Sequence, residues 1–143
     1  MKIAVLVVDT CVLIDIADDD PDFGGASAQA VATHLAGGLC VSPITYVELA
    51  PVFNASTRLL NEFLDGLGVD RSGGFEVADR DVAFSAWASQ VSARRAGRLG
   101  KRPVADVLIG ALALRCGGII TRNPDDFRVP YPKLRIVDPT RSR

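Results

Sequence analysis

Short apolar runs alternate with longer amphipathic segments along the chain, and this pattern predicts strands that alternate with helices. Residues 3–8 form a continuous β-branched and aliphatic run, typical of a strand buried on both faces of a parallel sheet. Further short strands are expected at 39–41, 75–77, 119–121 and 134–137. Helices are expected at 10–16, 27–36 and 54–67, at 79–95, from Pro43, and from Pro103 to the Cys116-Gly117-Gly118 stop.

Two sequence signals refine the predicted helices. Ser42 followed by Pro43 is typical of a helix start, which places Glu48 in the opening turns, near the positive end of the helix dipole. In the segment 79–95, four large apolar side chains are expected to form the buried face. They are Val82, Phe84, Trp87 and Val91.

Alternating strands and helices predict βαβ units. The expected fold is therefore a three-layer α/β/α structure, in which helices cover both faces of a parallel sheet of about five short strands. The 143 residues suit a single domain spanning 1–143, and 48% hydrophobic with 23% charged residues excludes disorder over most of the length.

Composition limits the candidate functions further. The formal net charge of −1 means that a polyanionic partner needs a local basic patch. The three cysteines lie in apolar runs without zinc-ligand spacing, so we expect reduced core residues and a cytoplasmic protein. The apolar run 3–8 is far shorter than the roughly 20 residues of a membrane span, so neither a membrane helix nor a signal peptide is expected.

Acidic residues follow the predicted strands. Ligands of parallel sheets gather at the carboxyl ends of the strands, so these side chains are expected to meet there. Clustered carboxylates repel one another unless a cation binds, and oxygen ligands favour Mg²⁺ or Mn²⁺. Such a site suits phosphodiester hydrolysis. The candidates are Asp9, Glu48, Asp106, and either Asp125 or Asp126.

Each acidic residue also has a simpler explanation. Asp9 could cap the helix that follows it, and Glu48 or Asp106 could be stabilised by a helix dipole. Asp125 and Asp126 could form a turn. A haloacid-dehalogenase-type phosphatase also begins with an aspartate after the first strand, but it requires a second aspartate where this chain has Cys11.

Four segments together carry a resemblance to a known family. They are 7–15 (VVDTCVLID), 42–49 (SPITYVEL), 106–111 (DVLIGA) and 121–127 (TRNPDDF). In this order the set resembles the PIN-domain family, in particular VapC-type toxins of type II toxin-antitoxin modules. The resemblance spans nearly the whole chain.

The resemblance implies a Mg²⁺-dependent endoribonuclease, with Mn²⁺ as a substitute, that cleaves RNA as a toxin. It also implies a VapB-type antitoxin partner and a homodimer. Asp9, Glu48 and Asp106 match the family's three core acidic residues. Many relatives carry an aspartate where this chain has Asn123, so Asp126 is the expected fourth catalytic and metal-binding residue. Thr121 is expected to support the metal ligands through its hydroxyl, and Asn123 could bind a metal-bound water.

A basic cluster precedes the predicted helix that carries Asp106, and it could bind RNA phosphates. It consists of Arg94, Arg95, Arg98, Lys101 and Arg102. A solvated charge run at a helix end is the alternative. Asn123 also leaves open a second function, a metal-degenerate PIN module that binds RNA or a protein without cleavage. The single histidine, His34, is assigned no catalytic role.

Overall fold

Five short parallel strands form one sheet at the centre of the molecule. The structure is a computed structural model that describes residues 5–95 and 103–141, with side chains for 5–91 and 104–141. The strands lie in the order β3-β2-β1-β4-β5, so β1 is central, and each neighbouring pair is parallel. They are β1 (Leu6–Val8), β2 (Leu39–Cys40), β3 (Val69–Asp70), β4 (Ile119–Ile120) and β5 (Ile136–Val137).

Helices connect the strands, and within the described residues side-chain caps are seen at the start of three of them. Asp9, Ser42 and Ser56 each accept a backbone N–H bond at a helix start, as predicted for Ser42 with Pro43. The helices are α1 (Thr10–Ala17), α2 (Gly24–His34), α3 (Pro43–Glu48), α4 (Thr57–Leu67), α5 (Val77–Arg95), α6 (Pro103–Cys116) and α7 (Pro124–Arg128), with 3-10 turns at Leu35–Gly37 and Ala50–Phe53.

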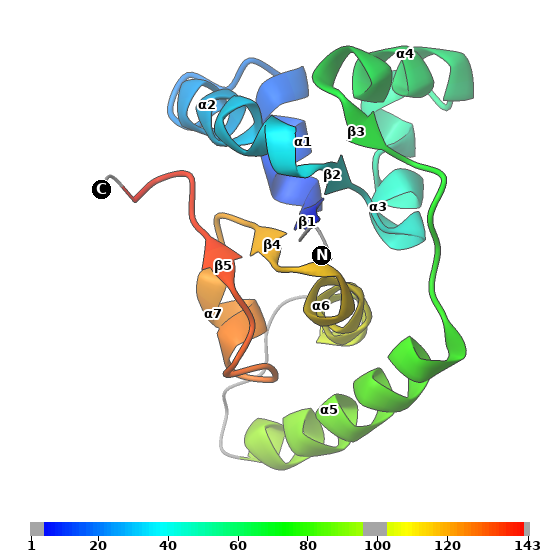
Figure 1. Ribbon diagram of the computed structural model, residues 1–143, viewed down its shortest axis with the longest axis vertical. Helices are drawn as coiled ribbons and strands as arrows, with labels where there is room; N and C mark the ends of the chain where they lie inside the picture. The colour runs from blue at the N-terminus through cyan, green and yellow to red at the C-terminus, as the bar shows by residue number, and fades with distance from the viewer. Residues whose placement is uncertain (1–4, 96–102, 142–143) are drawn as a thin grey trace.

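The sheet separates two apolar cores, which makes the fold three-layered (Figure 1). Strand β1 contributes side chains to both cores. Leu6 and Val8 pack with α1, α2 and α4, whereas Val7 packs with α6 and α7. This alternation follows from the two-residue period of a strand. Helix α5 packs on α6 at the outside of the second layer (Figure 1). The α/β fold predicted from the sequence is confirmed.

The prediction of a strand at residues 75–77 is wrong. Residues 75–77 do not form a strand; Val77 begins α5, and the sheet instead receives β3, in which Val69 pairs with Leu39. Gly68 adopts a left-handed conformation (φ +75°) that ends α4 and turns the chain directly into β3. A two-residue edge strand leaves little periodic signal in the sequence.

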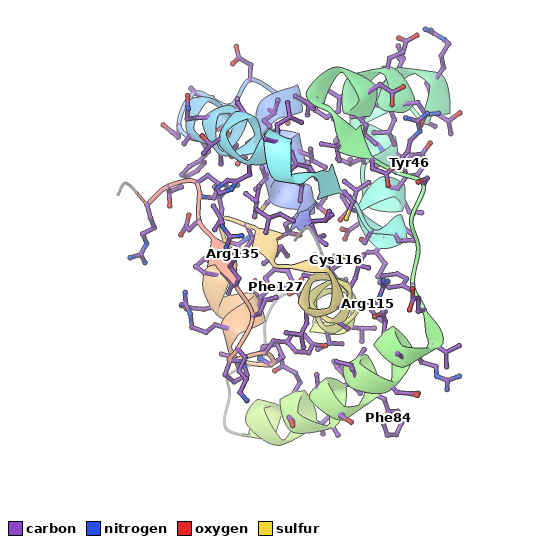
Figure 2. All side chains as sticks on the ribbon, in the orientation of Figure 1. Tyr46, Phe84, Arg115, Cys116, Phe127 and Arg135 are labelled. Atoms are coloured by element: carbon purple, nitrogen blue, oxygen red, sulfur yellow. The ribbon has the colours of Figure 1, made fainter. Side chains whose placement is uncertain are left out.

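The predicted buried face of α5 is also wrong. Phe84 is 77% exposed and points away from the molecule (Figure 2), and Val82 and Val91 are exposed as well. Only Trp87 of the four is half-buried against the core. Ala83 and Ala86 occupy the buried face instead, since small side chains let α5 approach α6 closely.

The structure bears on two expectations from composition, the state of the cysteines and the lack of a membrane helix. Cys11, Cys40 and Cys116 are half-buried free thiols. A hydrogen bond with Cys116, together with burial, raises the pKa of the Cys40 thiol. None of the helices within the described part of the chain has the length and apolar character needed to cross a membrane.

Candidate active site

The chain connections bring the predicted acidic residues to one edge of the sheet. Asp9 directly follows β1, and only two residues separate the end of β2 from α3, which carries Glu48. Helix α6 leads through Gly117 and Gly118 into β4, so it runs against the strand direction and its first turn, with Asp106, lies at the carboxyl edge. Helix α7, with Asp126, follows β4 at the same edge.

Asp9 is fully buried, and hydrogen bonds fix its carboxylate. Its Oδ1 accepts the N–H of Thr10 at 2.8 Å, and its Oδ2 accepts the hydroxyl of Thr121 at 2.8 Å. The N-cap role proposed as the simpler explanation is therefore real. The cap uses one of the roughly four hydrogen-bond acceptor positions of a carboxylate, so it does not exclude a second role for Asp9.

Glu48 is joined to Asp9 through Thr10. The Thr10 hydroxyl donates to Glu48 Oε1 at 2.7 Å and lies 2.9 Å from the hydroxyl oxygen of Thr45. The expected position near the positive end of α3 is wrong, because this six-residue helix ends at Glu48. A helix dipole disfavours a carboxylate at that end, so the dipole does not explain why Glu48 lies here.

Asp106 is the third acidic residue at this edge. It lies in the first turn of α6 and is 2% exposed. A hydrogen bond fixes the start of α6 to the segment after α7. The carbonyl oxygen of Val107 accepts this bond from the Tyr131 hydroxyl at 2.5 Å. Packing of α6 against β1 brings this helix alongside the strand that precedes Asp9.

The two candidates for the fourth acid differ in their surroundings. The Asp125 side chain is 87% exposed and pairs with Arg128 at 2.8 Å, whereas Asp126 is half-buried. Thr121 is fully buried and its hydroxyl oxygen accepts the N–H of Asn123 at 3.0 Å. Asn123 therefore contacts Thr121 through its backbone, while the residue as a whole is exposed.

The chemistry of these side chains fits a hard divalent cation. Asp9, Glu48 and Asp106 offer carboxylate oxygens, which Mg²⁺ and Mn²⁺ prefer. Within residues 5–95 and 103–141, however, no three His, Cys, Asp or Glu side chains form a group that could hold a metal on protein ligands alone. Mg²⁺ retains several water ligands, so its protein ligands need not all meet directly. These three carboxylates are the residues that would hold it.

Cys11 lies beside the candidate site without contributing a reactive group. Its Sγ is 3.5 Å from Asp9 Oδ2 and 3.8 Å from the Thr121 hydroxyl. Burial, followed by the charge of Asp9, raises the pKa of the Cys11 thiol to about 12. The side chain therefore remains a neutral thiol at physiological pH and is a poor nucleophile.

Sequence reasoning missed two contributors to this edge. Thr10 was treated only as the first residue of a helix, although its hydroxyl reaches Glu48. Arg122 received no predicted role, although it pairs with the buried Asp15 through Nε at 2.5 Å. An aspartate inside the otherwise apolar segment 11–17 was the available signal, because a buried charge requires a partner.

The predicted RNA-binding residues Arg94, Arg95, Arg98, Lys101 and Arg102 lie outside the residues whose side chains the structure describes. Two surface grooves are present in the described part of the molecule. One of about 800 Å³ lies between α2 and the segment after β5, and one of about 580 Å³ lies between α3 and the segment after β3. Neither groove is lined by Asp9, Glu48 or Asp106.

Comparison with known proteins agrees with this architecture. The model of the PIN domain family matches residues 6–131. Among solved structures, the chain is similar to one described as VapBC2 from Rickettsia felis bound to a DNA fragment from their promoter. The TM-score is 0.67 at 16% identity, covering 94% of this chain and 98% of that chain, which shows a shared fold. A search of curated proteins found no match. Because the family model covers most of its length, the chain belongs to the PIN domain family.

Proposed function

We propose that the chain is a Mg²⁺-dependent endoribonuclease that hydrolyses RNA phosphodiester bonds, with Asp9, Glu48, Asp106 and Asp126 as its metal-binding and catalytic residues. The observation that carries the proposal is the buried carboxylate of Asp9, oriented by Thr10 and Thr121 and connected to Glu48 through the Thr10 hydroxyl. Carboxylate oxygens that lie at one edge of the sheet are the ligands that a hard divalent cation prefers.

The chain's own residues prepare the site. The Thr10 N–H and the Thr121 hydroxyl prevent the Asp9 carboxylate from rotating, which lowers the reorganisation needed when a cation binds. Glu48 is held by Thr10 from the neighbouring helix. When bound, the ion would act as a Lewis acid that polarises a phosphoryl oxygen and eases deprotonation of the attacking water. The proposed reaction is in-line hydrolysis with the 3′-oxygen leaving.

RNA cleavage by the purified protein tests this function. Cleavage is expected with Mg²⁺ or Mn²⁺, and it should stop with EDTA and in Asp9→Asn, since asparagine retains the helix cap but not the charge. Asp18→Asn, at the exposed C-cap of the same helix, is the matched control and should cleave like the wild type. Cleavage that survives both EDTA and Asp9→Asn would contradict the proposal.

A second candidate function is favoured by two observations. Asn123 is an amide where the resemblance to VapC-type toxins leads us to expect an acid, and the described residues do not form a compact three-acid group. In this alternative the chain binds RNA or a protein without cutting. RNA retention without cleavage, at any Mg²⁺ or Mn²⁺ concentration, would support the alternative.

We also propose that the chain is the toxin of a toxin-antitoxin pair, that it binds a VapB-type antitoxin, and that it forms a homodimer. Support comes from the family membership and from the similar structure, which is described as VapBC2 bound to a DNA fragment from their promoter. Expression of the chain alone should arrest growth, and co-expression of a small protein encoded beside it should relieve the arrest. Sedimentation of the isolated chain tests the dimer.

A further inference from the structure

A partly buried ion pair joins α1 to Arg122, the residue that follows Thr121. Asp15, on α1, is 3% exposed, and its carboxylate accepts Arg122 Nε at 2.5 Å and Arg122 Nη2 at 3.0 Å. The Ser27 hydroxyl of α2 donates to the same carboxylate at 3.0 Å. These hydrogen bonds raise the pKa of the Arg122 guanidinium above its ordinary value, so the group is charged at all relevant pH values. The ion pair is bidentate, which fixes the orientation of the guanidinium.

The same guanidinium is held from a second direction. Its carbon atom lies 4.1 Å from the centre of the Phe23 ring, which precedes α2. A cation over an aromatic face is attracted by the ring, most strongly where water is excluded. Arg122 therefore attaches the segment after β4 to both α1 and α2, although that segment is far from these helices in the sequence.

The residues on either side of Arg122 complete the connection to the candidate site. Thr121 donates its hydroxyl to Asp9, and its oxygen accepts the N–H of Asn123. Because the amide approaches the oxygen, the hydroxyl proton is left to point at Asp9. The turn over residues 121–123 therefore sets the orientation of the Asp9 carboxylate. Arg122 is the side chain that anchors this turn.

We propose that Arg122 is a positioning residue: its contacts with Asp15 and Phe23 fix the 121–123 turn so that Thr121 holds Asp9 in its metal-binding orientation. The inference rests on the proposed function in taking Asp9 as a metal ligand. The anchoring of the turn is a separate statement about this chain, and it can be measured without RNA or metal.

A second ion pair provides a matched control. Arg115, on α6, binds the buried Asp79 of α5 with two nitrogens at 2.9 Å, and the two arginines are similarly exposed, 31% for Arg115 and 23% for Arg122. In the described part of the chain, the bonds of Asp79 and Arg115 run to each other and to Gly74 and Glu76, away from the 121–123 turn. Arg115→Gln should therefore reproduce the stability cost of a lost, partly buried pair without disturbing the 121–123 turn.

Amide hydrogen exchange is the first measurement. Arg122→Gln should accelerate exchange of the Asn123 and Thr10 amides more than that of Val7, whose N–H bonds Gly118 inside the sheet. Arg115→Gln should not produce this difference. The double variant Asp15→Asn/Arg122→Gln leaves no unpaired buried charge, so it should fold while still losing the anchor. Equal acceleration at all three amides in both Arg122 variants would overturn the inference.

Metal affinity is the second measurement. Calorimetric titration with Mn²⁺ should show about tenfold weaker binding for Arg122→Gln, the lower end of what outer contacts of metal ligands contribute. Arg115→Gln should bind Mn²⁺ like the wild type, and equal losses in the two variants would also overturn the inference. If the wild type binds no Mn²⁺, the proposed function fails, and the exchange data alone decide whether Arg122 anchors the turn.

Discussion

The hydroxyl of Thr10 donates to Glu48 Oε1 across 2.7 Å, although 38 positions separate the two residues. The backbone N–H of the same threonine donates to Asp9. One residue thus orients two carboxylates, one through its amide and one through its side chain. This relationship explains how an acidic pair is maintained at the carboxyl edge of the sheet, and it leads directly to a mutational test.

Thr10→Val should weaken the site more than it weakens the fold. Valine retains the shape and the backbone N–H but loses the hydroxyl, so Glu48 loses its orienting donor at a stability cost of about 1 kcal/mol. The Mg²⁺ concentration for half-maximal RNA cleavage should rise about tenfold. Thr10→Ser retains the hydroxyl and should behave like the wild type. An unchanged Mg²⁺ requirement in Thr10→Val would show that this hydrogen bond is not needed.

Asp126→Asn and Asp125→Asn should separate the two adjacent acids. Asp126 is half-buried in the first turn of α7, while Asp125 faces solvent and pairs with Arg128. We expect Asp126→Asn to slow cleavage about tenfold or more, because an amide replaces one of the proposed metal-binding carboxylates, and Asp125→Asn to leave the rate unchanged. The reverse order would move the fourth acid to Asp125.

The Asp79–Arg115 pair should contribute stability that depends on pH. The hydrogen bond from Arg115 lowers the pKa of Asp79 below its ordinary value of 3.8. The contribution is therefore present above pH 3.8 and is lost as the pH falls through the lowered value. Asp79→Asn should cost about 2 kcal/mol at pH 7, and urea titrations should show the difference from the wild type shrinking in acid.

An exposed neighbour provides the control for that prediction. Asp81 pairs with Arg80 at 3.0 Å, but its side chain is 65% exposed. Surface ion pairs contribute less than about 1 kcal/mol, so Asp81→Asn should change little at either pH. A cost for Asp81→Asn as large as that for Asp79→Asn would contradict the role given to burial.

Two glycines should respond in opposite directions to alanine. A Cβ atom at Gly110 would lie 2.4 Å from the Tyr131 ring, which is packed against α6, so Gly110→Ala should cost about 1–3 kcal/mol. At Gly66, within α4, no atom beyond the adjacent residues and the backbone of the helix itself lies within 4 Å of the added Cβ, and Gly66→Ala should stabilise the protein by up to about 1 kcal/mol. Urea unfolding of both variants checks the signs; a stabilised Gly110→Ala would mean that Tyr131 can move aside.

The predictable parts of this protein are those with local sequence signals. The β-branched run that ends at Asp9 and the Ser42-Pro43 helix start both carry local information, and both appear in the structure. The Thr10–Glu48 and Asp15–Arg122 contacts do not, because they depend on how α1 lies against α3 and against the segment after β4. Phe84 was misjudged for a related reason: a helix that packs through alanines can leave a large side chain exposed.

Anomalous diffraction from crystals soaked in Mn²⁺ tests the central claim most directly, because it locates the ion. The account predicts an anomalous peak at the carboxyl edge of the sheet, about 2.1 Å from an oxygen of Asp9, with Glu48 and Asp106 bound directly or through water. This peak should disappear in Asp9→Asn. A peak elsewhere, or none at a Mn²⁺ concentration that supports RNA cleavage, would contradict the account.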